Sequence, residues 1–70
     1  MKISARNQLR GTVVEVRRGQ TTAHVRIELS AGSTITSSIT NEAVDELGLV
    51  PGDLVIAIIK ASDVMVGKSV

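Results

Sequence analysis

The stretch from Leu54 to Ile59 constrains the fold of this chain more than any other part of the sequence. Its letters, LVIAII, are all apolar. Side chains of a strand point alternately to its two faces, so a strand of this composition has to be buried on both. The chain has 70 residues, 43% of them apolar, but no Phe, Tyr, Trp or Cys, and so small an aliphatic core cannot cover both faces by itself. The stretch therefore predicts an obligate oligomer, in which a partner subunit covers one face.

The first half of the chain has the composition of short strands. The β-branched residues Val13, Val14 and Val16 place the first strand at residues 9–17, and the second, at residues 21–29, alternates apolar and polar side chains. His24 lies on the polar face of the second strand, and without another His or Cys to join it we expect a neighbour of charged groups there, not a metal ligand.

The second half of the chain adds one helix and further strands. Residues 34–40 carry mostly hydroxyl side chains, as in an edge strand with one polar face. Residues 41–47 predict a short helix that Thr40 or Asn41 caps and Gly48 ends in a left-handed conformation. Strands at residues 54–59 and 64–66 complete an all-β fold, a small five-stranded OB-like barrel with one short helix, in a single domain of residues 1–70.

Composition excludes several functions. The net charge is only +1, without the dense basic stripe or the stacking aromatic residues of a nucleic-acid binder, so we expect no nucleic-acid partner. No apolar run approaches membrane-spanning length and no apolar leader follows Met1, so we expect no membrane contact and a cytoplasmic location. A single His, no Cys and no Gly-rich phosphate loop leave no catalytic set, so we expect no enzyme activity.

Three polar segments at strand ends share one chemistry. They are the arm with Ser4 and Arg6, the hydroxyl-rich strand that ends at Thr40, and residues 60–62. They offer hydroxyls, backbone N–H groups and the positive charges of Arg6 and Lys60. Ser4 and Arg6 stand two residues apart ahead of a strand, where alternation points both the same way. A tetrahedral oxyanion needs such a shell of donors, because all its oxygens accept hydrogen bonds. The alternative to an oxyanion site is that Arg6 is a solvated residue of the arm and Ser4 a turn residue, without a binding role.

Three stretches resemble the molbindins, the small molybdate-binding proteins of bacteria. They are residues 4–13, SARNQLRGTV, residues 47–53, LGLVPGD, and residues 58–65, IIKASDVM. The resemblance implies an OB-like fold, molybdate or tungstate as the bound ligand, and a homohexamer built as a trimer of dimers. It also implies that the sites lie between subunits and that the metal is held as molybdate, without direct protein ligands to the metal.

The resemblance also assigns residues to the oxyanion site. Ala43 stands where some relatives carry a serine, so one side-chain donor is missing at that position. Matched position by position, the oxyanion-binding residues implied are Ser4, Ala5, Arg6, Thr40, Lys60, Ala61 and Ser62. The function implied is intracellular binding, with storage or homeostasis of molybdate and tungstate.

Other functions stay open at this point. The stretch from Glu46 to Val55 also fits the helix, leucine-glycine turn and strand of an AbrB-like swapped-hairpin DNA-binding regulator. Its acidic helix and the lack of clustered basic residues argue against that function. Binding of single-stranded nucleic acid on an OB barrel and a purely structural scaffold are weaker alternatives, the first because no aromatic residue is present to stack on bases.

Overall fold

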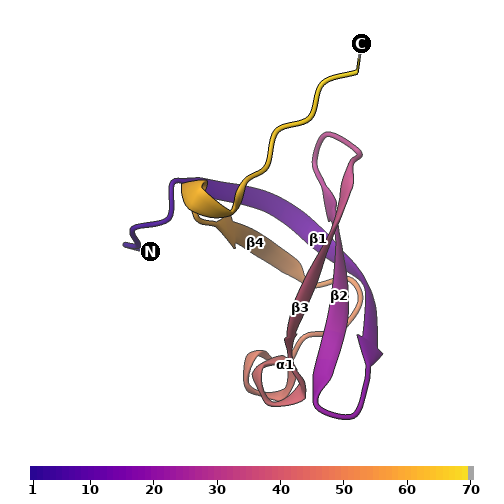
Figure 1. The fold of residues 1–70 in the computed structure, drawn as a ribbon. Coiled ribbons are helices and arrows are strands. Elements are labelled where there is room, and N and C mark those ends of the chain that lie inside the picture. Colours follow the sequence, from indigo (N-terminus) through magenta and orange to yellow (C-terminus); the bar gives the residue numbers. More distant parts are fainter. Residues whose placement is uncertain (70) are drawn as a thin grey trace.

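The computed structural model describes residues 1–69, and Figure 1 shows one curled antiparallel sheet with a short helix at one end. The order of strands in the sheet is β3-β2-β1-β4, which leaves β3 and β4 as its edges. The all-β, OB-like class expected from the sequence is confirmed. The elements in chain order are β1 (Asn7–Arg18), β2 (Thr22–Leu29), β3 (Thr34–Thr40), α1 (Asn41–Leu47), β4 (Leu54–Ile59) and a 3-10 turn (Ala61–Asp63).

The long strand β1 makes the sheet curl, because its two halves pair with different strands. Gly11 is paired with Leu29 of β2 on one side and with Val55 of β4 on the other. A Cβ atom at Gly11 would lie 2.6 Å from a methyl carbon of Ile27 and 2.7 Å from the carbonyl oxygen of Glu28. The register of β1 against β2 also shifts at a bulge just after this point. Strand β4 therefore crosses the direction of β2 and β3, as Figure 1 shows.

The helix α1 begins and ends at the residues expected from the sequence. The Thr40 hydroxyl accepts a hydrogen bond of 3.0 Å from the backbone N–H of Ala43, and Gly48 ends the helix in a left-handed conformation with φ 62°. Val44 is 1% exposed and packs the helix onto the sheet. Arg18, at the end of β1, lies 2.6 Å from the Asp45 carboxylate and links the helix to the first hairpin.

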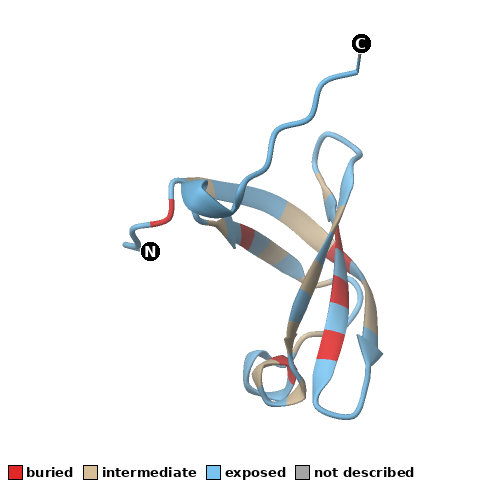
Figure 2. Ribbon diagram, viewed as in Figure 1, coloured by how far each residue is buried: buried red, intermediate tan, exposed pale blue. Residues whose placement is uncertain are grey.

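The core is small: most of it lies on β1 and β2, and the helix and β4 each add one buried residue (Figure 2). Within one chain only one face of β4 (residues 54–59) is covered, as expected from the sequence for a chain of this size. Ala57 is 7% exposed, whereas Leu54, Ile56 and Ile58 are 87%, 41% and 42% exposed on the opposite face. One apolar face of β4 is thus covered by the chain itself and the other is open. The fully or nearly buried core comprises Val13, Ala23, Val25, Ile27, Val44 and Ala57.

The expected fifth strand at residues 64–66 is wrong, and within residues 1–69 the sheet has four strands. After β4 the chain makes the 3-10 turn, closed by hydrogen bonds from the Asp63 N–H to the Lys60 oxygen and from the Val64 N–H to the Ala61 oxygen. This turn directs the tail away from the sheet (Figure 1), with Met65 93% exposed. Strand β1 is longer than expected at both ends, because it pairs with β4 as far as Asn7 and with β2 as far as Arg18.

The barrel is open between its two edge strands. An apolar groove of about 330 Å³ lies there, bordered by side chains of β3 and β4 and by Leu47 at the end of the helix. Leu47 is 68% exposed. In the part of the chain that the structure describes, no helix is long and apolar enough to cross a membrane.

Candidate functional site

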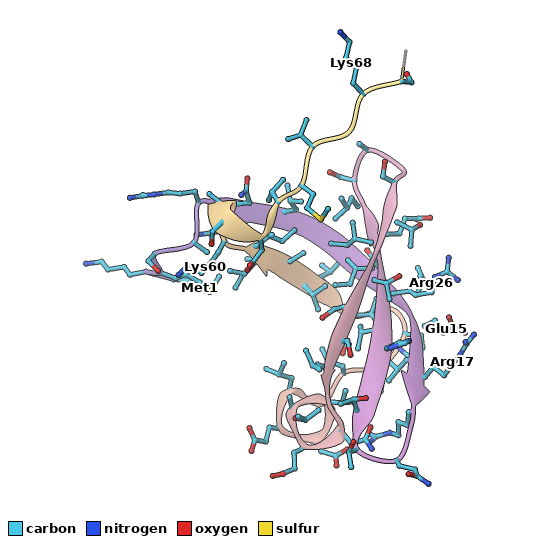
Figure 3. The ribbon with its side chains drawn as sticks, in the orientation of Figure 1. Met1, Glu15, Arg17, Arg26, Lys60 and Lys68 are labelled. Carbon is cyan, nitrogen blue, oxygen red and sulfur yellow. The ribbon has the colours of Figure 1, made fainter. Side chains whose placement is uncertain are left out.

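Two of the three polar segments come together where β1 begins and β4 ends. Asn7 and Ile59 form the last pair of the β1–β4 ladder, so Arg6 and Lys60 stand directly beyond it on neighbouring chain segments. The side-chain amide of Asn7 also donates a hydrogen bond of 3.2 Å to the carbonyl oxygen of Ile59. In Figure 3 Lys60 and Met1 are labelled at this same end of the molecule.

The N-terminal arm reaches this end by a path that differs from the one expected. Its backbone bends at Ser4 and at Arg6 instead of continuing β1 as an extended strand, so strand alternation does not explain how its side chains are placed. Burial gives a simpler account. Ala5 is 7% exposed while Ser4 and Arg6 are both exposed. The small Ala5 side chain therefore anchors the arm and leaves its hydroxyl and guanidinium neighbours outside the core.

The cations at this end form no ion pairs with acids of the described chain. Within residues 1–69, no carboxylate lies within ion-pair distance of Arg6 or Lys60. The ion pairs formed within residues 1–69 involve Glu15 and Asp45, which lie elsewhere on the sheet and on the helix. Figure 3 shows Glu15 between Arg17 and Arg26. Among the described residues, the end that holds Arg6 and Lys60 therefore carries two unpaired cations beside the single carboxylate of Asp63.

The segment after β4 adds hydroxyl and backbone donors. Ser62 lies in the 3-10 turn, and the first N–H groups of such a turn have no acceptor within it. Asp63 is the one acid of this turn, and its backbone N–H bonds the Lys60 oxygen at 2.9 Å. Residues 60–62 thus place one ammonium group, one hydroxyl and the backbone N–H groups of Ala61 and Ser62 beside the arm.

Thr40 lies far from these residues in the same chain. It caps α1 and is paired with Thr22, at the end of the sheet where β1 reaches Arg18. A strand rises about 3.3 Å per residue, so the 12 residues of β1 leave roughly 35 Å of strand between the two ends. The Thr40 oxygen accepts from Ala43, but its O–H is still able to donate. A shell that contains Thr40 and Arg6 together requires two copies of the chain.

His24 stands where the sequence places it, in a charged neighbourhood. It is exposed and directly opposite Arg17 on β1 and Ser38 on β3. Among the described residues no group of three or more His, Cys, Asp or Glu side chains is arranged to hold a metal ion. The candidate site is instead made of donors, and this chemistry suits an anion whose oxygens all accept.

Sequence reasoning missed Asn7, which joins the two segments of the site. In the sequence it is marked only by its place inside the stretch SARNQLRGTV. Its pairing with Ile59 depends on the register of the sheet and cannot be recognised from the sequence. Asn is disfavoured in strands, and an Asn as the first residue of a strand is the one local signal for a side-chain role.

Fold and site together define a class of protein, an open OB-type barrel with a cationic, hydroxyl-bearing end. The family model described as TOBE domain matches residues 3–66, and the chain therefore belongs to the TOBE domain family, in its molbindin group. Molybdenum-pterin-binding protein 1 of Clostridium pasteurianum is 48% identical over 66 residues, which are 94% of this chain and 97% of that protein.

Two solved structures agree with this assignment. A molybdate-binding protein from Sporomusa ovata matches with a TM-score of 0.92 at 41% identity, over 97% of this chain and 100% of that one. The cytoplasmic molybdate-binding protein ModG, solved with molybdate bound, matches with a TM-score of 0.89 at 49% identity, over 93% of this chain and 46% of that one. These similarities do not favour the alternative of a swapped-hairpin DNA-binding regulator.

Proposed function

We propose that this protein binds molybdate, and tungstate in its place, as a single molbindin-like domain spanning residues 1–70. Its role is storage or homeostasis of the oxyanion in the cytoplasm, without enzyme activity. The observation that carries the proposal is the pairing of Asn7 with Ile59, which brings the cations Arg6 and Lys60 to one end of the sheet, where no described carboxylate pairs with them. The names of the relatives, which bind molybdate or a molybdenum-pterin, supply the identity of the anion.

The chemistry of the shell explains which anions it accepts. Arg6 and Lys60 supply charge, and the hydroxyls of Ser4, Ser62 and, from a neighbouring copy, Thr40 donate hydrogen bonds. The backbone N–H groups at Ala5, Ala61 and Ser62 complete the set. The two cations and the backbone N–H groups only donate, so the P–OH of hydrogen phosphate would have only hydroxyl oxygens as acceptors, and this anion is disfavoured. Sulfate has the same charge as molybdate but is smaller, so only the size of the completed cavity distinguishes these two anions.

We further propose that each site is shared between copies in a homohexamer, a trimer of dimers. The distance between Thr40 and Arg6 along the sheet supports this, because one copy alone cannot bring both to the same anion. The exposed apolar face of β4 and the open groove beside it supply the apolar surface that subunit contacts would cover. Nucleic acid is not a partner in this proposal.

Native mass spectrometry, with and without molybdate, tests the proposal directly because it counts subunits and bound anions together. We expect six subunits, retention of molybdate and tungstate after desalting, and no retained phosphate. Sulfate at the same concentration is the matched control for charge. A monomer that retains no molybdate would refute both the anion and the assembly, and a hexamer without bound anion would refute the anion alone.

A further inference from the structure

The two segments of the proposed site continue from the end of the sheet, and apart from the buried Ala5 side chain they are held there through their inner ends. Residues 4–6 lead into β1 and residues 60–62 follow β4, so both lie just outside the last ladder pair. Strand ends open more readily than strand centres, because fewer hydrogen bonds must break. Without a further contact, the spacing between Arg6 and Lys60 would vary as this end of the ladder opens.

The side chain of Asn7 provides that contact. Its amide nitrogen donates to the Ile59 oxygen at 3.2 Å, in a half-buried position, across 52 positions of the sequence. The Ile59 carbonyl belongs to the peptide group that ends in the nitrogen of Lys60, so this bond fixes the orientation of that peptide. Asn7 is also bonded to Arg6 through the backbone. One side chain therefore restrains the chain next to both cations.

The other side-chain hydrogen bonds of the described chain lie elsewhere. Asn41 bonds the Gly19 oxygen at the first hairpin, and Asp53 accepts from Val50 in the turn before β4. Within residues 1–69, the bond from Asn7 is thus the one side-chain hydrogen bond that joins the start of β1 to the end of β4.

We propose that Asn7 is a positioning residue of the oxyanion site, which sets the spacing between residues 4–6 and 60–62 without touching the anion. The inference rests on the proposed function for its ligand. The hydrogen bond from Asn7 to Ile59, here called the clamp, is itself a property of the protein without anion. A hydrogen bond of this kind contributes modestly to stability, so its loss is expected to weaken molybdate binding about threefold to tenfold.

The test compares Asn7→Leu, which keeps the size and removes the donor, with Asn7→Gln, which restores a donor on a longer side chain. Gln8→Leu is the matched control, because Gln8 is the next residue of β1, is exposed, and faces the opposite side of the sheet. Each variant is titrated with molybdate by calorimetry, and amide hydrogen exchange is followed in the protein without anion.

We expect Asn7→Leu to weaken binding and to speed exchange at the outer pairs of the β1–β4 ladder, next to Asn7 and Ile59, while the β1–β2 hairpin is unchanged. Asn7→Gln should recover part of both effects, and Gln8→Leu should resemble the unaltered protein. Faster exchange spread evenly over all strands would show only a general loss of stability and would overturn the clamp.

The two proposals fail separately. If the unaltered protein does not bind molybdate, the proposed function fails while the exchange measurement still decides on the clamp. If the unaltered protein binds molybdate and Asn7→Leu binds it equally well, the clamp is refuted and the function stands.

Discussion

Replacing Arg6 with Ala should remove one of the two charges of the site and leave the fold intact. Arg6 is exposed, and within residues 1–69 no carboxylate is paired with it, so its loss breaks no ion pair and opens no cavity. A hydrogen bond to a charged group contributes about 1.5–3 kcal/mol. Because 1.4 kcal/mol is a factor of ten, the Kd for molybdate should rise between about tenfold and a hundredfold.

Calorimetric titration measures this change, and thermal unfolding gives a second measurement. Without molybdate, Arg6→Ala should unfold at the same temperature as the unaltered protein. With excess molybdate, a tenfold weaker affinity should remove about 1.4 kcal/mol of ligand-induced stabilisation for each site. Ser4→Ala should weaken binding less, because it deletes a neutral donor.

Two variants serve as controls for Arg6→Ala. Arg17→Ala also removes an exposed arginine, but one that lies within β1 and pairs with Glu15 at 3.3 Å. His24→Ala removes the single histidine. Both should bind molybdate as the unaltered protein does. If His24→Ala abolished binding while Arg6→Ala preserved it, the site would have to lie elsewhere and the reasoning from the β1–β4 end would be refuted.

Three further predictions concern other parts of the fold. Gly11→Ala should destabilise the protein by about 1–3 kcal/mol, because the added methyl group meets Ile27 and the Glu28 backbone, and a denaturation midpoint equal to that of the unaltered protein would contradict it. Thr40→Ala should lower the free energy of unfolding by about 1 kcal/mol, because the helix cap is lost, and should also weaken molybdate binding. Thr40→Ser should preserve both stability and binding, as measured by urea unfolding and by titration. Arg18→Gln should cost at most about 1 kcal/mol, since both partners of its ion pair are about half exposed or more, and the difference in unfolding temperature should shrink in high salt.

The local structure was predictable from the sequence wherever neighbouring residues decide it. Alternation in β2, the cap at Thr40 and the glycine after α1 depend on contacts within a few residues, and these elements appear as expected. Residues 64–66 show the limit of such reasoning. Three apolar residues favour a strand, but a strand exists only beside a partner, and the turn after Lys60 directs this segment away from the sheet.

The candidate site was predictable only in part, for the same physical reason. The residue types at positions 4, 6, 60 and 62 indicate an oxyanion, but their proximity depends on the register that pairs Asn7 with Ile59. Register is a long-range property of the sheet, set by packing and by the turns. Thr40 lies far from Arg6 because β1 is long. The composition of residues 34–40 could not predict this separation.

The open edge at β4 has a consequence for how this chain has to be handled and redesigned. An uncovered apolar edge strand is a template for pairing with any other strand, and proteins usually block such an edge with lysine, proline or an inward-pointing charge. Strand β4 carries none of these within Leu54–Ile59, and the nearest such residues, Pro51 and Lys60, flank it in the sequence. Both lie outside the strand, so they leave its backbone edge free to pair with another strand. To obtain a soluble single subunit, a charged residue should therefore replace Ile56 or Ile58 on the exposed face of β4. Substitutions on other surfaces would leave this apolar edge strand free to pair.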